Sequence, residues 1–86
     1  MGVEIYTKDS CMFCKKAKEM FQENGIPYQE HDVSTVAKFK AMQDRITGAK
    51  TVPQIIIDGH LIGGFEVLDA HKEAIFAKLK KTRASG

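Results

Sequence analysis

Tryptophan is absent from this chain of 86 residues, and proline and cysteine occur only twice each. Two cysteines are too few for a disulfide-stapled secreted scaffold, which carries about four or more in so short a chain. The longest apolar run, Ile55–Ile57, is far shorter than the roughly 20 residues of a membrane span. The N-terminus carries an acidic residue, Glu4, and lacks the apolar run of a secretory signal. These absences predict a soluble, cytoplasmic domain with no membrane partner.

Charge of one sign is also lacking. The chain has 13 lysines and arginines against 11 acidic residues, a formal net charge of +2 at pH 7. A protein that binds nucleic acid through its bulk field carries a larger basic excess, so we expect no nucleic-acid partner. The composition, with 43% hydrophobic and 28% charged residues, is that of an ordinary globular domain, and the length allows one core.

Hydrophobic periodicity and breaker residues predict an α/β protein with the element order β-α-β-α-β-β-α. The strands are expected at 3–7, 28–33, 54–57 and 60–62. The helices are expected from 11 or 12 to 24, from a cap at 34 or 35 to about 46, and from 65 or 66 to about 80. Gly25 and Pro27 end the first helix, and Asp58-Gly59 predicts a two-residue hairpin turn. The first three elements form a β-α-β unit, whose two strands run parallel.

The second and the last helix are each expected to bury one apolar face against the sheet. The face of the second helix consists of Val36, Phe39, Met42 and Ile46. The face of the last helix consists of Leu68, His71 or Lys72, Ile75, Phe76 and Leu79. We expect a single domain over residues 1–80, followed by a flexible C-terminal tail at residues 81–86.

The two cysteines form a C-x-x-C motif at the expected end of a strand and start of a helix. In a β-α-β context this spacing is typical of thioredoxin-like redox proteins. A helix N-terminus stabilises a thiolate, so Cys11 is expected to be exposed and nucleophilic, and Lys8 adds positive charge nearby. Cys14 lies nearly one turn inside the helix and is expected to be buried and less acidic. This asymmetry suits an attacking and a resolving thiol.

Two other interpretations of the cysteines remain. They are either small residues of the core or half of a zinc site. Structural zinc needs about four ligands, but the chain has no second C-x-x-C motif, and its histidines lack ligand spacing. These histidines are His31, His60 and His71. We therefore expect no metal, and we expect each histidine to be a surface or strand residue.

Two further segments have both a structural and a functional interpretation. Pro53 either begins a strand in the ordinary way or follows a cis peptide bond, which would expose the backbone of Val52 to an extended peptide. Gly63-Gly64 is either a tight turn or a point where a ligand's backbone approaches and a carboxylate reaches a helix N-terminus. Glu66 either compensates the dipole of that helix or belongs to the same site.

Together these motifs resemble the glutaredoxins, the small glutathione-dependent members of the thioredoxin fold. The resemblance extends from Val3 to about Leu79. The matching segments are Tyr6-Thr7-Lys8 followed by Cys11-x-Phe13-Cys14, then Thr51-Val52-Pro53-Gln54-Ile55, and then Asp58-Gly59-His60-Leu61-Ile62-Gly63-Gly64. The resemblance implies a thioredoxin-like fold with a four-stranded mixed sheet of order 2-1-3-4, an antiparallel fourth strand and three helices. It also implies that the Val52–Pro53 bond is cis.

The resemblance further implies a groove that binds glutathione as a co-substrate. Its expected members are Lys8, Phe13, Thr51, Val52, Pro53, Gly63, Gly64, Phe65 and Glu66. Lys8 would face the glycine carboxylate, and Val52 would pair with the backbone of the tripeptide. The backbone N–H groups of Gly64 and Phe65 would receive the γ-glutamyl carboxylate, and Glu66 would approach its amine.

Three positions depart from the family's pattern. Met12 stands where a proline is usual after the first cysteine, and Phe13 stands where a tyrosine is usual before the second. Many relatives carry two acidic residues after Gly-Gly-x, whereas here Glu66 is followed by Val67. Recognition of the γ-glutamyl amine is therefore expected to be weaker or differently arranged.

The resemblance implies a monomeric glutathione–disulfide oxidoreductase that uses Cys11 and Cys14. Its expected partners are glutathione and disulfide-bonded or glutathionylated proteins, among them ribonucleotide reductase. One alternative is a dimer that holds a [2Fe–2S] cluster through Cys11 and bound glutathione. Another is a thioredoxin-like electron donor reduced by a flavoprotein, against which the absence of tryptophan, the short chain and Gly63-Gly64 argue.

Overall fold

The computed structural model describes residues 2–84 as an α/β fold of four strands and four helices. The first half of the described chain contains β1 (Val3–Thr7), α1 (Met12–Glu23), β2 (Tyr28–Asp32) and α2 (Val36–Arg45). The second half contains β3 (Gln54–Ile57), β4 (His60–Gly63), α3 (Phe65–Ala70) and α4 (Lys72–Ala84). Within residues 2–84, no helix is both long and apolar enough to cross a membrane.

The four strands form one mixed sheet in the order β2-β1-β3-β4, as predicted. Strand β1 runs parallel to β2 and antiparallel to β3, and β4 runs antiparallel to β3. Tyr6 near the end of β1 is opposite Gln54 at the start of β3. This register brings the segment that follows β1, with both cysteines, beside the segment that precedes β3, with Val52 and Pro53.

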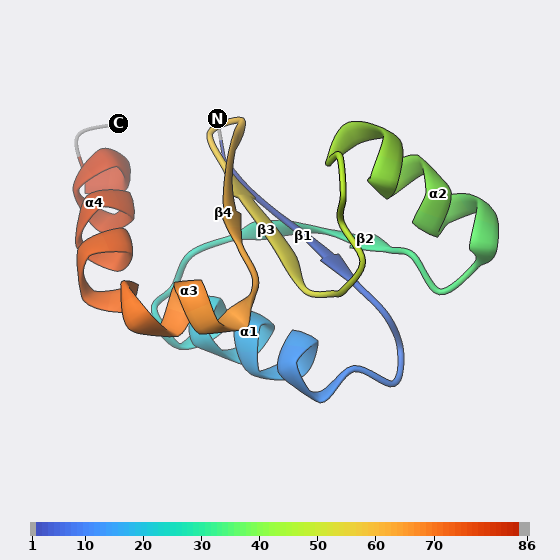
Figure 1. Ribbon diagram of the computed structural model, residues 1–86. Coiled ribbons are helices and arrows are strands. Elements are labelled where there is room, and N and C mark those ends of the chain that lie inside the picture. Colours follow the sequence, from blue (N-terminus) through green and yellow to red (C-terminus); the bar gives the residue numbers. More distant parts are fainter. Residues whose placement is uncertain (1, 85–86) are drawn as a thin grey trace.

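The sheet separates two apolar layers because successive side chains of a strand point to opposite faces. One layer lies between the sheet and the helices α1, α3 and α4. Its buried residues are Val3, Ile5, Ala17, Phe21, Ile26, Ile55, Leu68 and Phe76. The other packs against α2 and consists of Tyr6, Val33, Met42, Ile46, Ala49 and Ile56. Figure 1 shows α2 on one side of the sheet and α1 with α3 on the other.

Helix α1 follows the sequence prediction closely. Cys11 is its N-cap, with extended backbone angles (φ −90°, ψ 113°), and Cys14, Ala17 and Phe21 form its buried face. Gly25 adopts a left-handed conformation (φ +66°) just after the helix, which glycine adopts without the steric cost that a Cβ atom brings. The helix therefore begins directly after the first cysteine of the motif, which caps it.

The single last helix predicted over 65–80 is wrong, because the structure has two helices there, and the fold has four helices rather than three. Helix α3 ends at Ala70, with His71 as its C-cap (φ −115°, ψ 18°), and α4 then leaves in a different direction (Figure 1). Leu68 of α3 is fully buried, and Phe76 of α4 packs edge-on against Phe21 with ring centroids 5.2 Å apart. Both side chains belong to the same apolar layer.

The end of the chain and the start of α2 also differ from expectation. Helix α4 continues past Lys80 to Ala84, whereas Ser85 and Gly86 lie outside the described residues. A flexible tail and a domain limit at residue 80 stay predictions. The expected burial of Val36 is wrong, since this residue is 80% exposed. Helical side chains lean toward the N-terminus, so the first residue of α2 projects past the end of the helix.

Candidate active site

The two cysteines of the C-x-x-C motif have different surroundings. Cys11 is partly exposed, and the backbone N–H of Cys14 donates to its sulfur at 3.2 Å. Cys14 faces the core and is only 1% exposed. An N–H group aimed at a sulfur at a helix N-terminus stabilises negative charge on that sulfur. The geometry thus favours Cys11 as the attacking thiol, as the sequence predicted.

The thiol of Cys14 is held in its protonated form. Burial raises the pKa of Cys14 to about 12, and its contact with the Cys11 sulfur acts in the same direction. The charge of Lys18 acts in the opposite direction. Only the thiolate is a nucleophile, so Cys14 is unreactive near neutral pH until something assists its ionisation.

The segment before β3 approaches the first cysteine. The Val52–Pro53 peptide bond is cis, which decides between the two interpretations of Pro53. The thiol of Cys11 donates a hydrogen bond to the backbone carbonyl of Val52, with 3.5 Å between sulfur and oxygen. A molecule that pairs with the backbone of Val52 therefore has its own atoms close to the Cys11 sulfur.

A cavity of about 400 Å³ opens next to this contact. It is lined by Phe13, Thr51, Val52, Pro53, Gly64, Phe65, Glu66 and Val67, which we call the groove. The rings of Phe13 and Phe65, whose centroids lie 5.5 Å apart, give this lining an apolar wall. A Cβ atom on Gly64 would stand 3.5 Å from the carbonyl oxygen of Pro53, so a side chain there would enter the space between the two segments.

The structure brings together seven of the nine residues predicted for a ligand groove. The exceptions are Lys8 and Gly63. The ammonium of Lys8 lies over the ring of Phe39 in α2, 4.2 Å from its centroid, rather than in the groove. Gly63 stands just before the groove and contributes a left-handed backbone (φ +124°) that turns the chain into α3.

Two residues near the groove were not predicted to belong to it. Val67 lines the cavity and is 40% exposed. Lys16 holds its ammonium 5.5 Å from the centroid of the Phe13 ring. The spacing of Phe13 and Lys16 along α1 is a signal for this contact, because helical residues at i and i+3 are neighbours on the surface.

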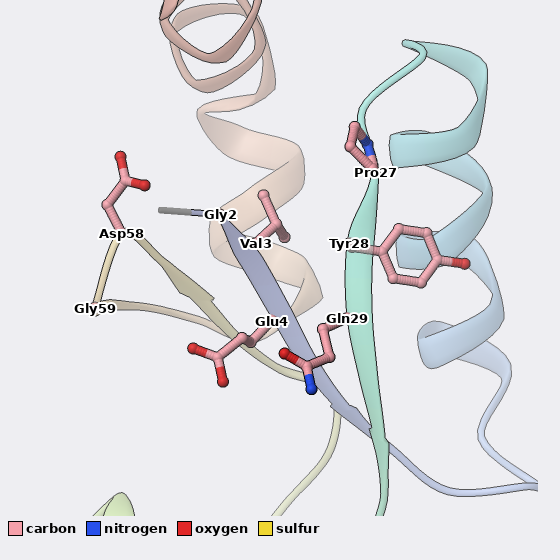
Figure 2. A pocket seen from close by; sticks show the side chains of 8 residues that line it. All are labelled: Gly2, Val3, Glu4, Pro27, Tyr28, Gln29, Asp58 and Gly59. Carbon is pink, nitrogen blue, oxygen red and sulfur yellow. The ribbon is translucent and has the colours of Figure 1, made fainter. Parts of the chain in front are cut away.

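A larger cavity, about 660 Å³, lies at the other end of the sheet. Figure 2 shows its lining where β1 and β2 begin and where β3 turns into β4. The lining residues are Gly2, Val3, Glu4, Pro27, Tyr28, Gln29, Asp58 and Gly59. Val52, which lines the groove, accepts a hydrogen bond from the thiol of Cys11, so the groove beside Cys11 is the candidate active site.

The histidine of β2, His31, contacts neighbouring side chains of the protein. His31 contacts a carboxylate oxygen of Glu4 at 3.0 Å and stacks against Tyr6, with ring centroids 4.8 Å apart. Among residues 2–84, no three His, Cys, Asp or Glu side chains gather into a group that could hold a metal ion.

Comparison with known proteins agrees with the geometry of this site. The family model described as glutaredoxin matches residues 3–62, which include both cysteines and the Val52–Pro53 segment. The chain belongs to the glutaredoxin family. It is 40% identical to glutaredoxin 3 of Escherichia coli K12 over 69 residues, which cover 80% of this chain and 83% of the relative. It is also 40% identical to glutaredoxin 1 of Rickettsia felis over an alignment of 91 positions, which covers 95% of this chain and 89% of the relative.

Solved glutaredoxin structures have the same fold. Glutaredoxin 1 of Francisella tularensis, complexed with cacodylate, matches with a TM-score of 0.79 and 36% identity, covering 87% of this chain and 95% of that one. A buckwheat glutaredoxin–glutathione complex matches with a TM-score of 0.77 and 26% identity, covering 93% of this chain and 77% of the buckwheat chain. The glutaredoxin family and fold support thiol–disulfide oxidoreductase activity for this chain.

Proposed function

We propose that this glutaredoxin uses glutathione to reduce protein disulfides and protein–glutathione mixed disulfides through Cys11 and Cys14. The contact between Cys11 and Val52 carries the proposal. It sets the attacking sulfur 3.5 Å from a backbone carbonyl that lines the groove. A tripeptide paired with that backbone in an extended form brings its own cysteine sulfur to Cys11.

The groove has the features that a γ-glutamyl peptide needs. The backbone of Val52 offers pairing along the peptide, and the rings of Phe13 and Phe65 cover its apolar atoms. Gly64 caps α3 without a side-chain hydrogen bond, which leaves backbone N–H groups for the γ-glutamyl carboxylate. Glu66 lines the same cavity and suits the amine. The glutathione complex of the buckwheat relative supports this assignment.

Lys8 reaches the glycine carboxylate only by leaving Phe39. Its ammonium lies 4.2 Å from the centroid of that ring, a contact worth about 0.5 to 1 kcal/mol at an exposed site. A hydrogen bond between an ammonium and a carboxylate is of similar or greater strength. Exchange of one contact for the other on ligand binding is therefore feasible.

In the monothiol route, the Cys11 thiolate attacks the glutathione sulfur of a mixed disulfide, and the protein thiol leaves and takes a proton. A second glutathione then attacks the Cys11 adduct and leaves as glutathione disulfide, which restores the thiolate. In the dithiol route, Cys11 attacks a protein disulfide, and Cys14 attacks the resulting mixed disulfide to close the Cys11–Cys14 bond. Glutathione reduces this bond in turn.

The setting of this activity is also a proposal. We expect it in the cytoplasm, where thiols are kept reduced. Glutathionylated proteins and ribonucleotide reductase are proposed clients, and the enzyme is proposed to act as a monomer.

A glutathione-coupled assay on three proteins tests the proposal. With a glutathionylated protein as substrate, Cys11→Ser is expected to lower turnover to background, because the attacking sulfur is lost. Cys14→Ser is expected to keep this activity and to lose reduction of a protein disulfide, which needs the resolving thiol. Loss of deglutathionylation in Cys14→Ser, with the fold intact by circular dichroism, would contradict the assigned roles.

A further inference from the structure

A chain of three polar side chains links the sheet to α1 below the buried cysteine. The hydroxyl of Thr7, a residue only 1% exposed at the end of β1, donates to an Oε atom of Glu30 at 2.6 Å. The ammonium of Lys18 donates to the same oxygen at 2.9 Å. The Lys18 side chain is 27% exposed, although lysines usually extend fully into water. Its position is therefore fixed by the carboxylate of Glu30.

Lys18 lies one helical turn after Cys14 on the same side of α1. Residues at i and i+4 are neighbours on a helix, and helical side chains lean toward the N-terminus. The stem of Lys18 thus extends back over the turn that carries Cys14. Lys15 and Lys16, by contrast, are exposed, and Lys16 is directed to the ring of Phe13.

The resolving step needs such a charge. Cys14 must develop negative charge on sulfur when it attacks the mixed disulfide on Cys11, yet burial raises its pKa to about 12. The hydrogen bond to Glu30 raises the pKa of Lys18, so its ammonium stays charged throughout the neutral range. The other groups that act on Cys14 are Cys11, which disfavours its ionisation, and the backbone of Lys8, which favours it.

Building on the proposed dithiol route, we propose that Lys18 is a positioning residue for the resolving step. Its ammonium, anchored by Glu30 and Thr7, stabilises the negative charge that develops on the Cys14 sulfur during attack. In this step the Cys14 sulfur forms a bond to the Cys11 sulfur, and the bond between Cys11 and the leaving sulfur breaks. The leaving sulfur belongs to the client protein in the dithiol route and to glutathione in the experiment below. The leaving thiolate takes the proton that Cys14 gives up. Cys14 is oxidised and the leaving sulfur is reduced, while Cys11 stays in a disulfide throughout.

If the ion pair between Lys18 of α1 and Glu30 of β2 only stabilised the fold, its removal would have a different effect. Partly exposed pairs contribute little to stability, and their loss would affect both thiol reactions alike. A charge that acts on Cys14 affects closure of the Cys11–Cys14 bond and spares formation of the adduct on Cys11. The two thiol steps must therefore be measured separately.

The experiment mixes the reduced protein with excess glutathione disulfide and quenches it with acid at intervals. Mass spectrometry then separates the glutathione adduct on Cys11 from the internal disulfide. Lys18→Met is expected to slow closure about fivefold, because loss of a partly solvated charge that acts on Cys14 changes an energy by about 1 kcal/mol. Lys18→Arg, which keeps the charge, is expected to restore most of the rate. Lys15→Met is the matched control on the same helix and is expected to close at the wild-type rate.

Two further readings separate charge from structure. Lys18→Met is expected to reach the wild-type closure rate only at a higher pH. The difference in closure rate between the two proteins is expected to shrink at high salt. Equal closure rates in Lys18→Met and wild type, or an equal slowing of both steps, would overturn the proposal. If glutathione disulfide reacts with none of the proteins, that result refutes the proposed function and leaves the role of Lys18 to be tested separately. The same series is then repeated with an aromatic disulfide, whose adduct on Cys11 allows the closure rates to be compared.

Discussion

Cys11 and Cys14 differ in surroundings although they are separated by less than one helical turn. Cys11 stands at the N-cap of α1, where a backbone N–H donates to its sulfur and where the groove begins. Cys14 lies in the core, and burial raises its pKa to about 12. Because only a thiolate reacts with an electrophile, the position of each residue on the helix determines its chemical role.

Alkylation of the reduced protein tests this difference. Native protein treated with iodoacetamide near neutral pH is expected to gain one adduct, which peptide mapping locates on Cys11. The same protein in denaturant is expected to gain two, because unfolding exposes Cys14 and lowers its pKa. Native Cys11→Ser serves as the control and is expected to gain none on the same timescale. Comparable modification of both cysteines in the native wild type would refute the asymmetry.

At the scale of elements, a polar cluster fastens α2 to the sheet. Arg45 at the end of α2 forms two hydrogen bonds with the carboxylate of Glu4, at 2.8 and 3.0 Å, and a third with the hydroxyl of Tyr6 at 2.8 Å. The hydrogen bonds from Arg45, and then from His31, lower the pKa of Glu4 to about 2. The cluster holds the end of α2 from which the chain continues toward Val52.

Arg45→Ala is expected to lower the free energy of unfolding by about 1 kcal/mol near neutral pH, since solvent reaches the pair and weakens it. Glu4 has a lower pKa when folded than when unfolded, so its stabilisation is complete above about pH 4.5 and is lost as the pH falls toward about 2. The difference between Arg45→Ala and wild type in urea unfolding should therefore shrink over this range to what the hydrogen bond with Tyr6 contributes.

Lys40→Ala removes a positive charge from an exposed position of the same helix and is the matched control. It is expected to leave stability unchanged at every pH. A deficit in Arg45→Ala that stays constant from neutral pH to pH 2 would show that its cause is lost packing rather than the ion pair.

Local signals explain which elements could be predicted. Breakers at Gly25, Pro27 and Asp58-Gly59 mark the ends of elements, and the apolar spacing of Cys14, Ala17 and Phe21 marks the face of α1. The break between α3 and α4 has no such signal, because no glycine or proline stands near His71. Leu68 of α3 and Phe76 of α4 pack into the same apolar layer, an arrangement of the assembled helices that no local residue pattern marks.

The whole molecule assembles its groove from three distant segments. The β1–β3 register places the cysteine segment beside Val52, and the turn at Gly63 brings α3 against the same segment. Seven of the groove residues could be predicted from family motifs, which are continuous in sequence. The position of Lys8 could not be predicted, because its contact with Phe39 joins a loop to the far side of the sheet.

The most direct test of this account is a nuclear magnetic resonance titration of Cys11→Ser with reduced glutathione. This variant keeps the groove and cannot form the covalent adduct. Backbone amide resonances of Val52, Gly64 and Phe65 are expected to shift with a single saturable binding curve, while those of Gln29 and Gly59 in the cavity of Figure 2 stay fixed. Shifts centred on Gln29 and Gly59, or none in the groove at saturating glutathione, would contradict the assignment of the groove beside Cys11 as the glutathione site.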